Sequence, residues 1–415
     1  MTISYLKIAN YRSIDVLQLH DIKPFSVFAG PNGSGKSNFF EALDFINLVI
    51  RFGADEALKK QGGFENIRCW KRHELDARVF EFEISIDGLN SYQLKIHQLD
   101  KSPMLEERLQ QINDDGSMWT IHREAGKALK QGDKTIDLPF NLSMLLFFGT
   151  SSISQFLKNI RRYQFDSLEA RIAVKNQDIS ELNHNGRNLA GVLRRLEKDE
   201  EIYDIISEWM DLLVPGLEKV YTDLDRLDGN TQLAFKEEYI DKPFPAYLIY
   251  DGTIKLLNVL VAMFDRSAPF GMLLIEEPES GLHPKAVIEL VEDFREEATL
   301  ERPIWVTTHH DSLIRCLKNN ELWLVDKKQG ATQMKVDTML YETMQGWYQT
   351  AEERGEKRGE AEMLLHVLTD KFGKVDKQTE AIISSLDEKS LFECVGRLSS
   401  AHSVQDVISH KRSSL

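Results

Sequence analysis

One segment near the amino end has residue types and spacing that can bind phosphate. It reads Gly30-Pro31-Asn32-Gly33-Ser34-Gly35-Lys36-Ser37 and fits the pattern G-x-x-x-x-G-K-[ST]. Glycine permits backbone angles that bulkier residues resist, so successive N–H groups can point at a phosphate. Lys36 adds a positive charge that can bind the β- and γ-phosphate oxygens, and we also expect it to take part in catalysis. Ser37 offers a hydroxyl to Mg²⁺. We predict that these eight residues and Asn38 bind a nucleotide; the alternative is a glycine loop over a β–α turn.

A second segment, "MLLIEEPESGLHP", ends an apolar run in two acids. A site that hydrolyses a nucleotide needs a carboxylate near Mg²⁺ and a group that orients water. Met272–Ile275 predicts a buried strand, and Glu276 at its end can hold Mg²⁺ directly or through water. Glu277 follows, where it can polarise the attacking water. The alternative is a strand that ends in a solvated acidic turn.

A third strand end, "IWVTTHHDSL", carries two histidines. His309 follows Thr307-Thr308 at the strand tip, where an imidazole can hydrogen-bond the γ-phosphate and sense its loss. His310 competes for this role. A histidine at a strand end is also compatible with a purely structural role.

These segments need a scaffold that brings them together. Three strands are indicated in residues 3–30, and a helix follows from Lys36 to about Phe52. Residues 1–125 are rich in strand patterns, 154–215 are charged and helical, and 217–250 return to strands. Helices at 252–265 and 284–299 then alternate with strands up to "ELWLVDKK". Such alternation is typical of a parallel sheet with its ligand at the carboxyl ends of the strands, an α/β fold.

Composition narrows the class of protein. The 415 residues are 42% hydrophobic and 28% charged, a soluble globular profile that suggests two or three domains. A net charge of −15 argues against an overall basic coat, but it allows a local basic groove. Cys69, Cys316 and Cys394 are scattered, so neither a disulfide framework nor a zinc site is indicated. No signal peptide or membrane-spanning stretch is recognisable, and we expect a cytoplasmic protein.

Together, "IANYRSI", "FAGPNGSGKSN", "LLIEEPESGLHP" and "VTTHH" resemble the ABC-type ATPase heads of the SMC/RecF/OLD superfamily. The resemblance is closer to bacterial AAA-family predicted ATPases that lack long coiled-coil arms, and it covers about residues 1–335. It implies a P-loop NTPase head, with a mixed β subdomain and a parallel sheet flanked by helices, that uses ATP and Mg²⁺. It also implies a homodimer in which two heads sandwich ATP and hydrolysis opens the pair.

The resemblance assigns further residues to the site. The family's signature, of the type L-S-D-G-T, reads Ile249-Tyr250-Asp251-Gly252-Thr253 here. Its helix N-terminus would meet the γ-phosphate of the partner head, through Asp251, Gly252 and Thr253. Arg12 in "NYRSI" matches a recurrent basic position that can reach the phosphates; the alternative is a solvated strand residue. A glutamine loop with a metal-binding role is also expected, and Gln61 is our candidate.

Three positions depart from the family pattern. Tyr250 replaces the signature serine, so the usual hydroxyl contact is lost or taken over by Thr253. Glu276 replaces the aspartate of the Walker B motif, and His283 stands where transporters carry an aspartate. The first departure puts the dimer geometry and the turnover rate in question.

On this basis we divide the chain into four parts. Residues 1–153 form the first half of the head with the β subdomain, 154–216 a helical insert, 217–340 the second half of the head, and 341–415 a charged linker with a small all-α domain. The insert carries Lys158, Arg161, Arg162, Arg187, Arg194 and Arg195, which form either a phosphate-binding surface or an ordinary charged face. The tail resembles a helical domain of the Rpn transposase-like nucleases.

Two functions remain open at this point. The first is an ATP-hydrolysing switch that acts on DNA or on an effector partner, in phage defence or genome maintenance. The second is a nucleotide-gated sensor or scaffold with little turnover that regulates a toxin or nuclease partner; Tyr250 favours it. No membrane partner is expected. The biological role in both cases rests on analogy with the family.

Overall fold

The computed structural model divides into two units, Met1–Thr338 and Met339–Leu415. It describes residues 3–72, 78–98, 102–112, 115–131, 134–148, 151–175, 181–225, 227–265, 267 and 270–336, and the single positions 368, 379, 383, 394, 404 and 407. In the second unit, Leu368, Ile383 and Val407 are buried. The predicted linker and the features that resemble the Rpn proteins otherwise lie outside the described residues.

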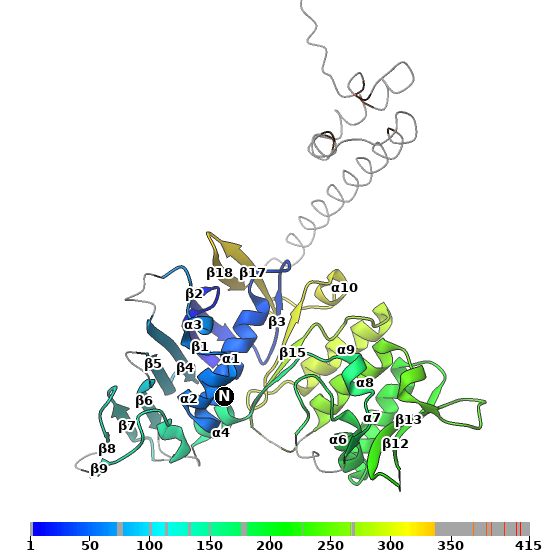
Figure 1. The fold of residues 1–415 in the computed structure, drawn as a ribbon, viewed down its shortest axis with the longest axis horizontal. Coiled ribbons are helices and arrows are strands. Elements are labelled where there is room, and N and C mark those ends of the chain that lie inside the picture. Colours follow the sequence, from blue (N-terminus) through cyan, green and yellow to red (C-terminus); the bar gives the residue numbers. More distant parts are fainter. Residues whose placement is uncertain are drawn as a thin grey trace, which may run out of the picture. The chain divides into compact units, whose positions relative to one another are not determined.

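An antiparallel eight-stranded sheet forms the β subdomain (Figure 1). Its order is β2-β1-β4-β5-β6-β7-β8-β9. The strands are β1 (Ile3–Tyr11), β2 (Ile14–Ile22), β4 (Val79–Ile86), β5 (Asn90–His97), β6 (Met104–Ile112), β7 (Met118–Arg123), β8 (Leu129–Gln131) and β9 (Lys134–Ile136). Burial alternates strictly along β4, where Phe80, Phe82 and Ile84 face the core. This period of two is what a sheet with one covered face requires.

A six-stranded sheet carries the predicted site. Its order is β10-β15-β16-β3-β17-β18, with parallel pairing from β10 to β17 and an antiparallel last strand. The strands are β10 (Ile160–Tyr163), β15 (Met272–Glu276), β16 (Ile304–Thr308), β3 (Phe25–Ala29), β17 (Leu322–Lys328) and β18 (Ala331–Val336). Strands β15, β16 and β3 are buried throughout, which explains their continuous apolar sequences.

Helix α1 (Lys36–Phe52) packs against both sheets and connects them (Figure 1). Phe39 lies 4.9 Å from Phe28 of β3, ring centre to ring centre, and Phe45 lies 5.3 Å from Phe80 of β4. One face of the helix therefore fixes the nucleotide loop to the parallel sheet, and another face fixes it to the β subdomain. Burial of these rings stabilises the arrangement by roughly 1.5–3 kcal/mol per side chain.

The remaining elements surround these sheets. The helices are α2 (Ala54–Lys60), α3 (Phe64–Ile67), α4 (Ser152–Lys158), α5 (Ser167–Ala170), α6 (Leu189–Leu196), α7 (Glu200–Leu213), α8 (Asp251–Phe264), α9 (Pro284–Glu297) and α10 (Asp311–Ile314), with 3-10 turns at Met144–Leu146 and Ala246–Leu248. A small sheet contains β11 (Val174–Lys175), β12 (Leu217–Leu224), β13 (Asn230–Glu237) and β14 (Phe244–Pro245). In the part of the chain that the structure describes, no helix has both the length and the apolar character to cross a bilayer.

The α/β fold class is confirmed, and the elements around the three motifs form as expected. The structure differs in the segment that we expected to be helical, because Ile160–Tyr163 is a strand beside β15. This strand is hard to recognise in the sequence because two adjacent arginines interrupt its apolar residues. Ile160 and Tyr163 are buried, while Arg161 and Arg162 make ion pairs. Strand β18 was also missed, and it follows a tight turn at Gln329-Gly330.

Candidate active site

The nucleotide loop begins where β3 ends, at the edge of the parallel sheet. Gly33 and Gly35 have positive φ angles of 79° and 105°. A Cβ at Gly30 would lie 2.1 Å from the carbonyl oxygen of Val325, and one at Gly35 would lie 2.0 Å from Oγ1 of Thr332. Glycine is therefore required at both ends of the loop. Gly35 is the N-cap residue of α1, whose first turn contains no acid, so this helix terminus favours an anion.

Lys36 lies folded into the loop. Its Nζ donates to the carbonyl oxygens of Gly30 at 2.7 Å and Pro31 at 3.2 Å. Burial lowers the pKa of Lys36, while the nearby Glu277 and Glu276 act in the opposite direction. Ser34 is also buried, and its hydroxyl has no partner among the described residues. A loop with a buried cation and a free hydroxyl fits an anionic ligand such as a nucleotide phosphate.

A set of small polar side chains supports the loop from behind. Asn38 Nδ2 donates to Ser13 Oγ at 2.6 Å, and this hydroxyl lies 2.7 Å from Oγ1 of Thr332. Thr332 in turn donates to the carbonyl oxygen of Ser34 at 3.0 Å. Asn38 thus contacts the support of the loop rather than the loop itself. Thr332 lies on β18, which the sequence analysis did not detect.

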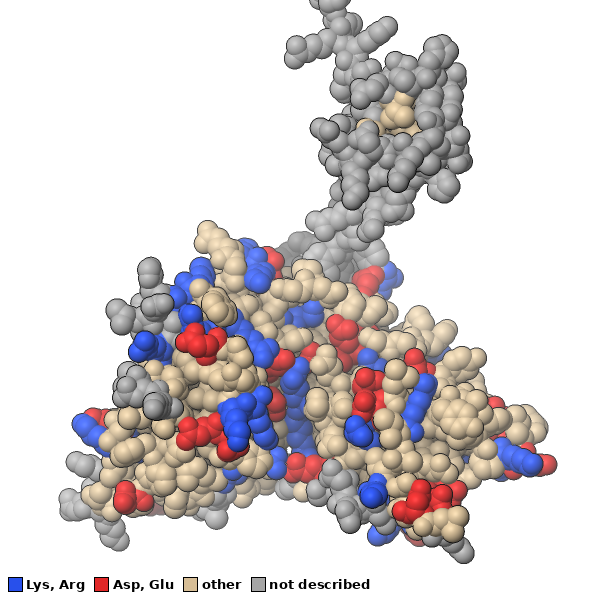
Figure 2. Space-filling view, viewed as in Figure 1, with Lys and Arg blue, Asp and Glu red and all other residues tan. Residues whose placement is uncertain are grey.

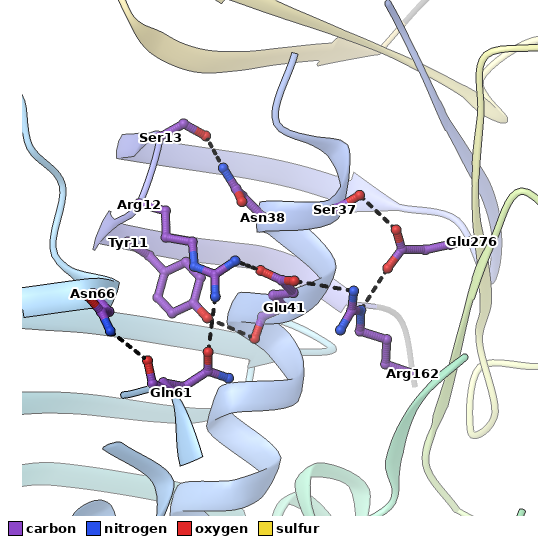
Figure 3. A network of polar contacts seen from close by, with 10 residues as sticks. All are labelled: Tyr11, Arg12, Ser13, Ser37, Asn38, Glu41, Gln61, Asn66, Arg162 and Glu276. Atoms are coloured by element: carbon purple, nitrogen blue, oxygen red, sulfur yellow. Dashed lines mark hydrogen bonds and ion pairs between the residues drawn. The ribbon is translucent and has the colours of Figure 1, made fainter. Parts of the chain in front are cut away.

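The candidate metal ligands lie together. Ser37 Oγ donates to Oε2 of Glu276 at 2.7 Å, and Arg162 Nε donates to the other oxygen, Oε1, at 2.7 Å (Figure 3). A hydroxyl and a carboxylate are ligands that Mg²⁺ accepts, with the rest of its shell completed by substrate phosphates and water. Within the described ranges, no group of three or more His, Cys, Asp or Glu residues could hold a metal by itself. The residues present fit a magnesium ion that is bound jointly with a nucleotide.

Gln61 and Arg12 lie on the far side of this network (Figure 3). Arg12 Nη2 donates to Oε1 of Gln61 at 3.0 Å, and Arg12 also pairs with Glu41. Gln61 therefore contacts Arg12 and Asn66 rather than Ser37 or Glu276. An exposed glutamine that we did not select, Gln164, directly follows β10.

Gln164 is the better-placed candidate for the expected glutamine loop. Tyr163 is in register with Ile275, so Gln164 leaves the sheet beside the strand that ends in Glu276. The carboxyl ends of parallel strands share one edge. The signal was present in "IRRYQF", but we interpreted that segment as helix.

Glu277 and His309 form a second close pair. His309 Nδ1 lies 2.8 Å from Oε1 of Glu277. Glu277 has a positive φ of 47°, and its N–H donates to the carbonyl oxygen of Thr307 at 3.0 Å. This left-handed conformation is uncommon for a residue with a side chain, and it turns the glutamate toward the tip of β16. His309 is thus the histidine that contacts the acid. The ring of His310 lies 4.2 Å from that of His309, centre to centre, at a tilt of 36°. Burial, followed by the charge of His309, lowers the pKa of His310.

A third acid, Glu279, completes this edge and was not predicted. Thr308 Oγ1 donates to its Oε1, while its Oε2 has no hydrogen-bond partner within the described part of the chain. Glu279 is 4% exposed, and burial raises its pKa. The same threonine hydroxyl accepts from the N–H of His310 at 2.9 Å. Glu279 therefore holds the turn that carries both histidines.

The signature segment begins α8. Asp251 pairs with Arg171 at 2.6 Å, and Tyr250, the residue before the helix, is 88% exposed. A Cβ on Gly252 would lie 2.2 Å from the carbonyl oxygen of Gly281, so this glycine allows α8 to approach the segment that follows the acidic pair. His283 caps α9, because its Nδ1 accepts from the N–H of Lys285 at 3.3 Å. This N-cap contact gives a structural reason for a histidine at position 283, where transporters carry an aspartate.

The six basic residues of the insert do not form one free phosphate-binding surface. Lys158 donates to the carbonyl oxygen of Leu145, and four of the five arginines pair with acids: Arg161 with Glu181, Arg162 with Glu276 and Glu41, Arg187 with Glu169, and Arg195 with Asp265. On the face drawn in Figure 2, Lys and Arg are interspersed with Asp and Glu. The structure favours the alternative of an ordinary charged face, because most of these basic side chains form ion pairs with neighbouring acids.

Comparisons with known proteins agree with this fold. A family model described as "AAA domain, putative AbiEii toxin, Type IV TA system" matches residues 25–315. The DNA replication and repair protein RecF of Corynebacterium jeikeium is 39% identical over 64 residues, 15% of this chain and 15% of that protein. RecF of Nitrosococcus oceani is 33% identical over 69 residues, 16% of this chain and 19% of that protein. The chain thus matches less than a fifth of the length of either relative.

Among solved structures, the Smc head bound to the C-winged helix domain of ScpA superposes with a TM-score of 0.52. The identity is 15%, and the match covers 83% of this chain and 99% of that chain. At this low identity, the similarity shows the fold alone. With the family match and the RecF segments, it confirms the predicted resemblance to SMC/RecF-type ATPases.

Proposed function

This chain belongs to the AAA-domain family described as putative AbiEii toxin of type IV TA systems, an SMC/RecF-type P-loop ATPase family, and we propose that it binds ATP with Mg²⁺ and hydrolyses it. The observation that carries the proposal is the 2.7 Å contact between Ser37 and Glu276. It brings the hydroxyl of the nucleotide loop to the acid at the end of β15. A bound magnesium ion would neutralise charge on the phosphates at this point.

Each side chain of the site has a distinct role in this proposal. The loop N–H groups and Lys36 hold the phosphates, and the Lys36 ammonium moves from the carbonyl oxygens of Gly30 and Pro31 to the phosphate oxygens. Glu277 accepts a hydrogen bond from the attacking water and orients it. His309, 2.8 Å from Glu277, keeps that carboxylate aimed and contacts the γ-phosphate. General-base assistance of this kind contributes about 10²–10⁴-fold to a rate.

We further propose that two copies pair around ATP. The support is the N-terminus of α8, which begins with Asp251, Gly252 and Thr253; Arg171 pairs with Asp251, the acid of the first turn, so the helix dipole can still favour an anion there. Tyr250, Tyr247 and Leu248 are exposed beside it. A second copy that brings its nucleotide to this terminus would cover these side chains. We also propose that residues 1–153 and 217–340 are the two halves of one ATPase head, with 154–216 as a helical insert between them. Residues 341–415 form the separate tail in this proposal.

Two kinds of target fit the proposed switch. DNA is one candidate, since the RecF relatives are DNA replication and repair proteins. An effector protein is the other, since the family is described as a putative toxin of a toxin–antitoxin system. An alternative function, a nucleotide-gated scaffold with little turnover, is supported by the exposed tyrosine at position 250.

One experiment separates these functions. ATP hydrolysis by the full chain is measured with Mg²⁺ alone and after addition of double-stranded DNA, single-stranded DNA or RNA. Stimulation by one nucleic acid supports a switch that acts on it. Tight ATP binding without turnover in any of the four conditions supports the scaffold. Absence of ATP binding would refute the proposal as a whole.

A further inference from the structure

Arg162 occupies a position that the proposed reaction leaves unexplained. It lies on β10, next to the strand that ends in Glu276. Its Nε donates to Oε1 of Glu276 at 2.7 Å, and its side chain is 13% exposed while that of Glu276 is 5% exposed. Since Ser37 holds Oε2 at 2.7 Å, both oxygens of this carboxylate are engaged.

Arg162 is itself held by a second acid. Its Nη2 lies 3.3 Å from Oε1 of Glu41, and the other oxygen of Glu41 accepts from Arg12 (Figure 3). Two cations and two carboxylates thus alternate from Arg12 to Glu276. This alternation balances charge in a partly buried region, where unpaired charges are costly.

We propose that Arg162 is a positioning residue for the metal-binding carboxylate: through Nε it fixes Oε1 of Glu276, so that Oε2 faces the Ser37 hydroxyl. Glu41 in turn positions Arg162. The inference rests on the proposed function, because it assigns Ser37 and Glu276 to Mg²⁺.

The physical argument concerns orientation. A carboxylate on a flexible glutamate arm can adopt several rotamers, and only one of them presents Oε2 to Ser37. Without Arg162, the buried Glu276 would turn toward another cation, and Lys36 is close enough to interact with it electrostatically. The metal ligands would then lose their arrangement. Loss of the partner that orients a metal ligand typically weakens metal binding by about 10–100-fold.

The chain contains a matched control. Arg161 is the preceding residue on the same strand, its side chain is 16% exposed, and it pairs with Glu181 at 3.4 Å rather than with the site. Arg162→Met and Arg161→Met therefore remove the same type of side chain, at similar burial, from the same element. Arg162→Lys keeps the charge but loses the forked donor, and Glu41→Gln removes the negative charge that pairs with Arg162. Thermal melting verifies that each variant is folded.

Two readouts are compared in the full-length protein. The first is the affinity for a fluorescent ATP analogue, measured in EDTA and along a Mg²⁺ titration. The second is the Mg²⁺ concentration that gives half-maximal ATP hydrolysis. Arg162→Met should raise the Mg²⁺ requirement about tenfold or more in both, with affinity in EDTA within about threefold of wild type. Arg162→Lys and Glu41→Gln should give smaller shifts in the same direction, and Arg161→Met should give none.

Three results would overturn the inference. An unchanged Mg²⁺ requirement in both Arg162 variants would remove its positioning role. Tighter Mg²⁺ binding would mean that Arg162 competes with the metal. An equal shift in Arg161→Met would reduce the effect to packing of β10. A wild-type protein that binds no ATP at any Mg²⁺ concentration would instead refute the proposed function, and the inference with it.

Discussion

The hydroxyl of Ser37 donates a 2.7 Å hydrogen bond to Oε2 of Glu276, a residue 239 positions later in the chain. Ser37 lies in the first turn of the helix after β3, and Glu276 ends β15; strand β16 lies between these two strands. All three run parallel, so their carboxyl ends lie at one edge. The parallel order of the sheet therefore assembles the site, and the contact is a direct consequence of it.

Removal of the loop lysine tests the phosphate site. Lys36→Ala should weaken ATP binding at least about 100-fold, because hydrogen bonds from a charged donor contribute roughly 1.5–3 kcal/mol each. The measurement is calorimetric titration with ATP and Mg²⁺. Lys59→Ala is the control, since Lys59 is exposed on α2. Binding as tight as that of wild type would contradict the assignment of the loop.

The acid–histidine pair predicts a separation of binding from turnover. Glu277→Gln should keep ATP affinity, lower hydrolysis by about 10²–10⁴-fold and let ATP-bound dimers accumulate. His309→Ala should lower hydrolysis less, since it leaves the carboxylate in place. Phosphate release and size-exclusion chromatography with ATP measure the two effects. Turnover that is unchanged in Glu277→Gln would exclude Glu277 from the reaction.

A buried acid on α9 predicts a pH-dependent stability. Asp293 is buried, its Oδ2 has no partner within the described residues, and burial, reinforced by Glu296 and Glu289, raises its pKa from 3.8 to about 8. The folded state thus keeps a proton that the unfolded state releases. The stability from this proton is present below pH 3.8 and is lost as the pH rises through about 8.

Asp293→Asn should therefore raise the melting temperature, and by more at pH 8.5 than at pH 5. The gain at high pH should be on the order of 1–3 kcal/mol, the cost of leaving a buried polar group unpaired. Lys285→Gln, at an exposed residue near the start of the same helix that does not contribute to this pKa shift, is the control. The same gain for Asp293→Asn at both pH values would contradict the assigned titration.

The sequence predicted the parts of the site that are local in the chain. The glycine loop, the acid after Met272–Ile275 and the histidine after β16 each have a short pattern, and the structure brings them to one edge. The sequence could not predict the contacts of Arg162 and Thr332 with the site, because those contacts depend on which strands become neighbours in the sheet. The charged side chains of Arg161 and Arg162 suggested a helical surface, whereas both residues belong to the edge strand β10 of the parallel sheet.

Gln61 was a weaker choice for a related reason. A glutamine after the first helix can only be assigned to a metal site once the strand order is known, and that order favours Gln164 beside Glu276. Glu279 was missed because a carboxylate that follows a proline resembles a solvated turn in the sequence. In the structure, it is buried and holds Thr308.

Tyr250, the residue before α8, allows a test of the proposed pairing of two copies around ATP. Tyr250 stands where the family signature has serine, and its side chain is 88% exposed, so its replacement leaves the core unchanged. Tyr250→Ser should restore a small hydroxyl at the helix terminus that faces the second copy's nucleotide. We expect ATP-dependent dimerisation to strengthen and turnover to rise about three- to tenfold, the effect of one added hydrogen bond. Tyr239→Ser, at an exposed tyrosine that follows β13, is the control. If Tyr250→Ser and Tyr239→Ser behave alike, the terminus of α8 does not meet the nucleotide, and the paired-head proposal loses its main support.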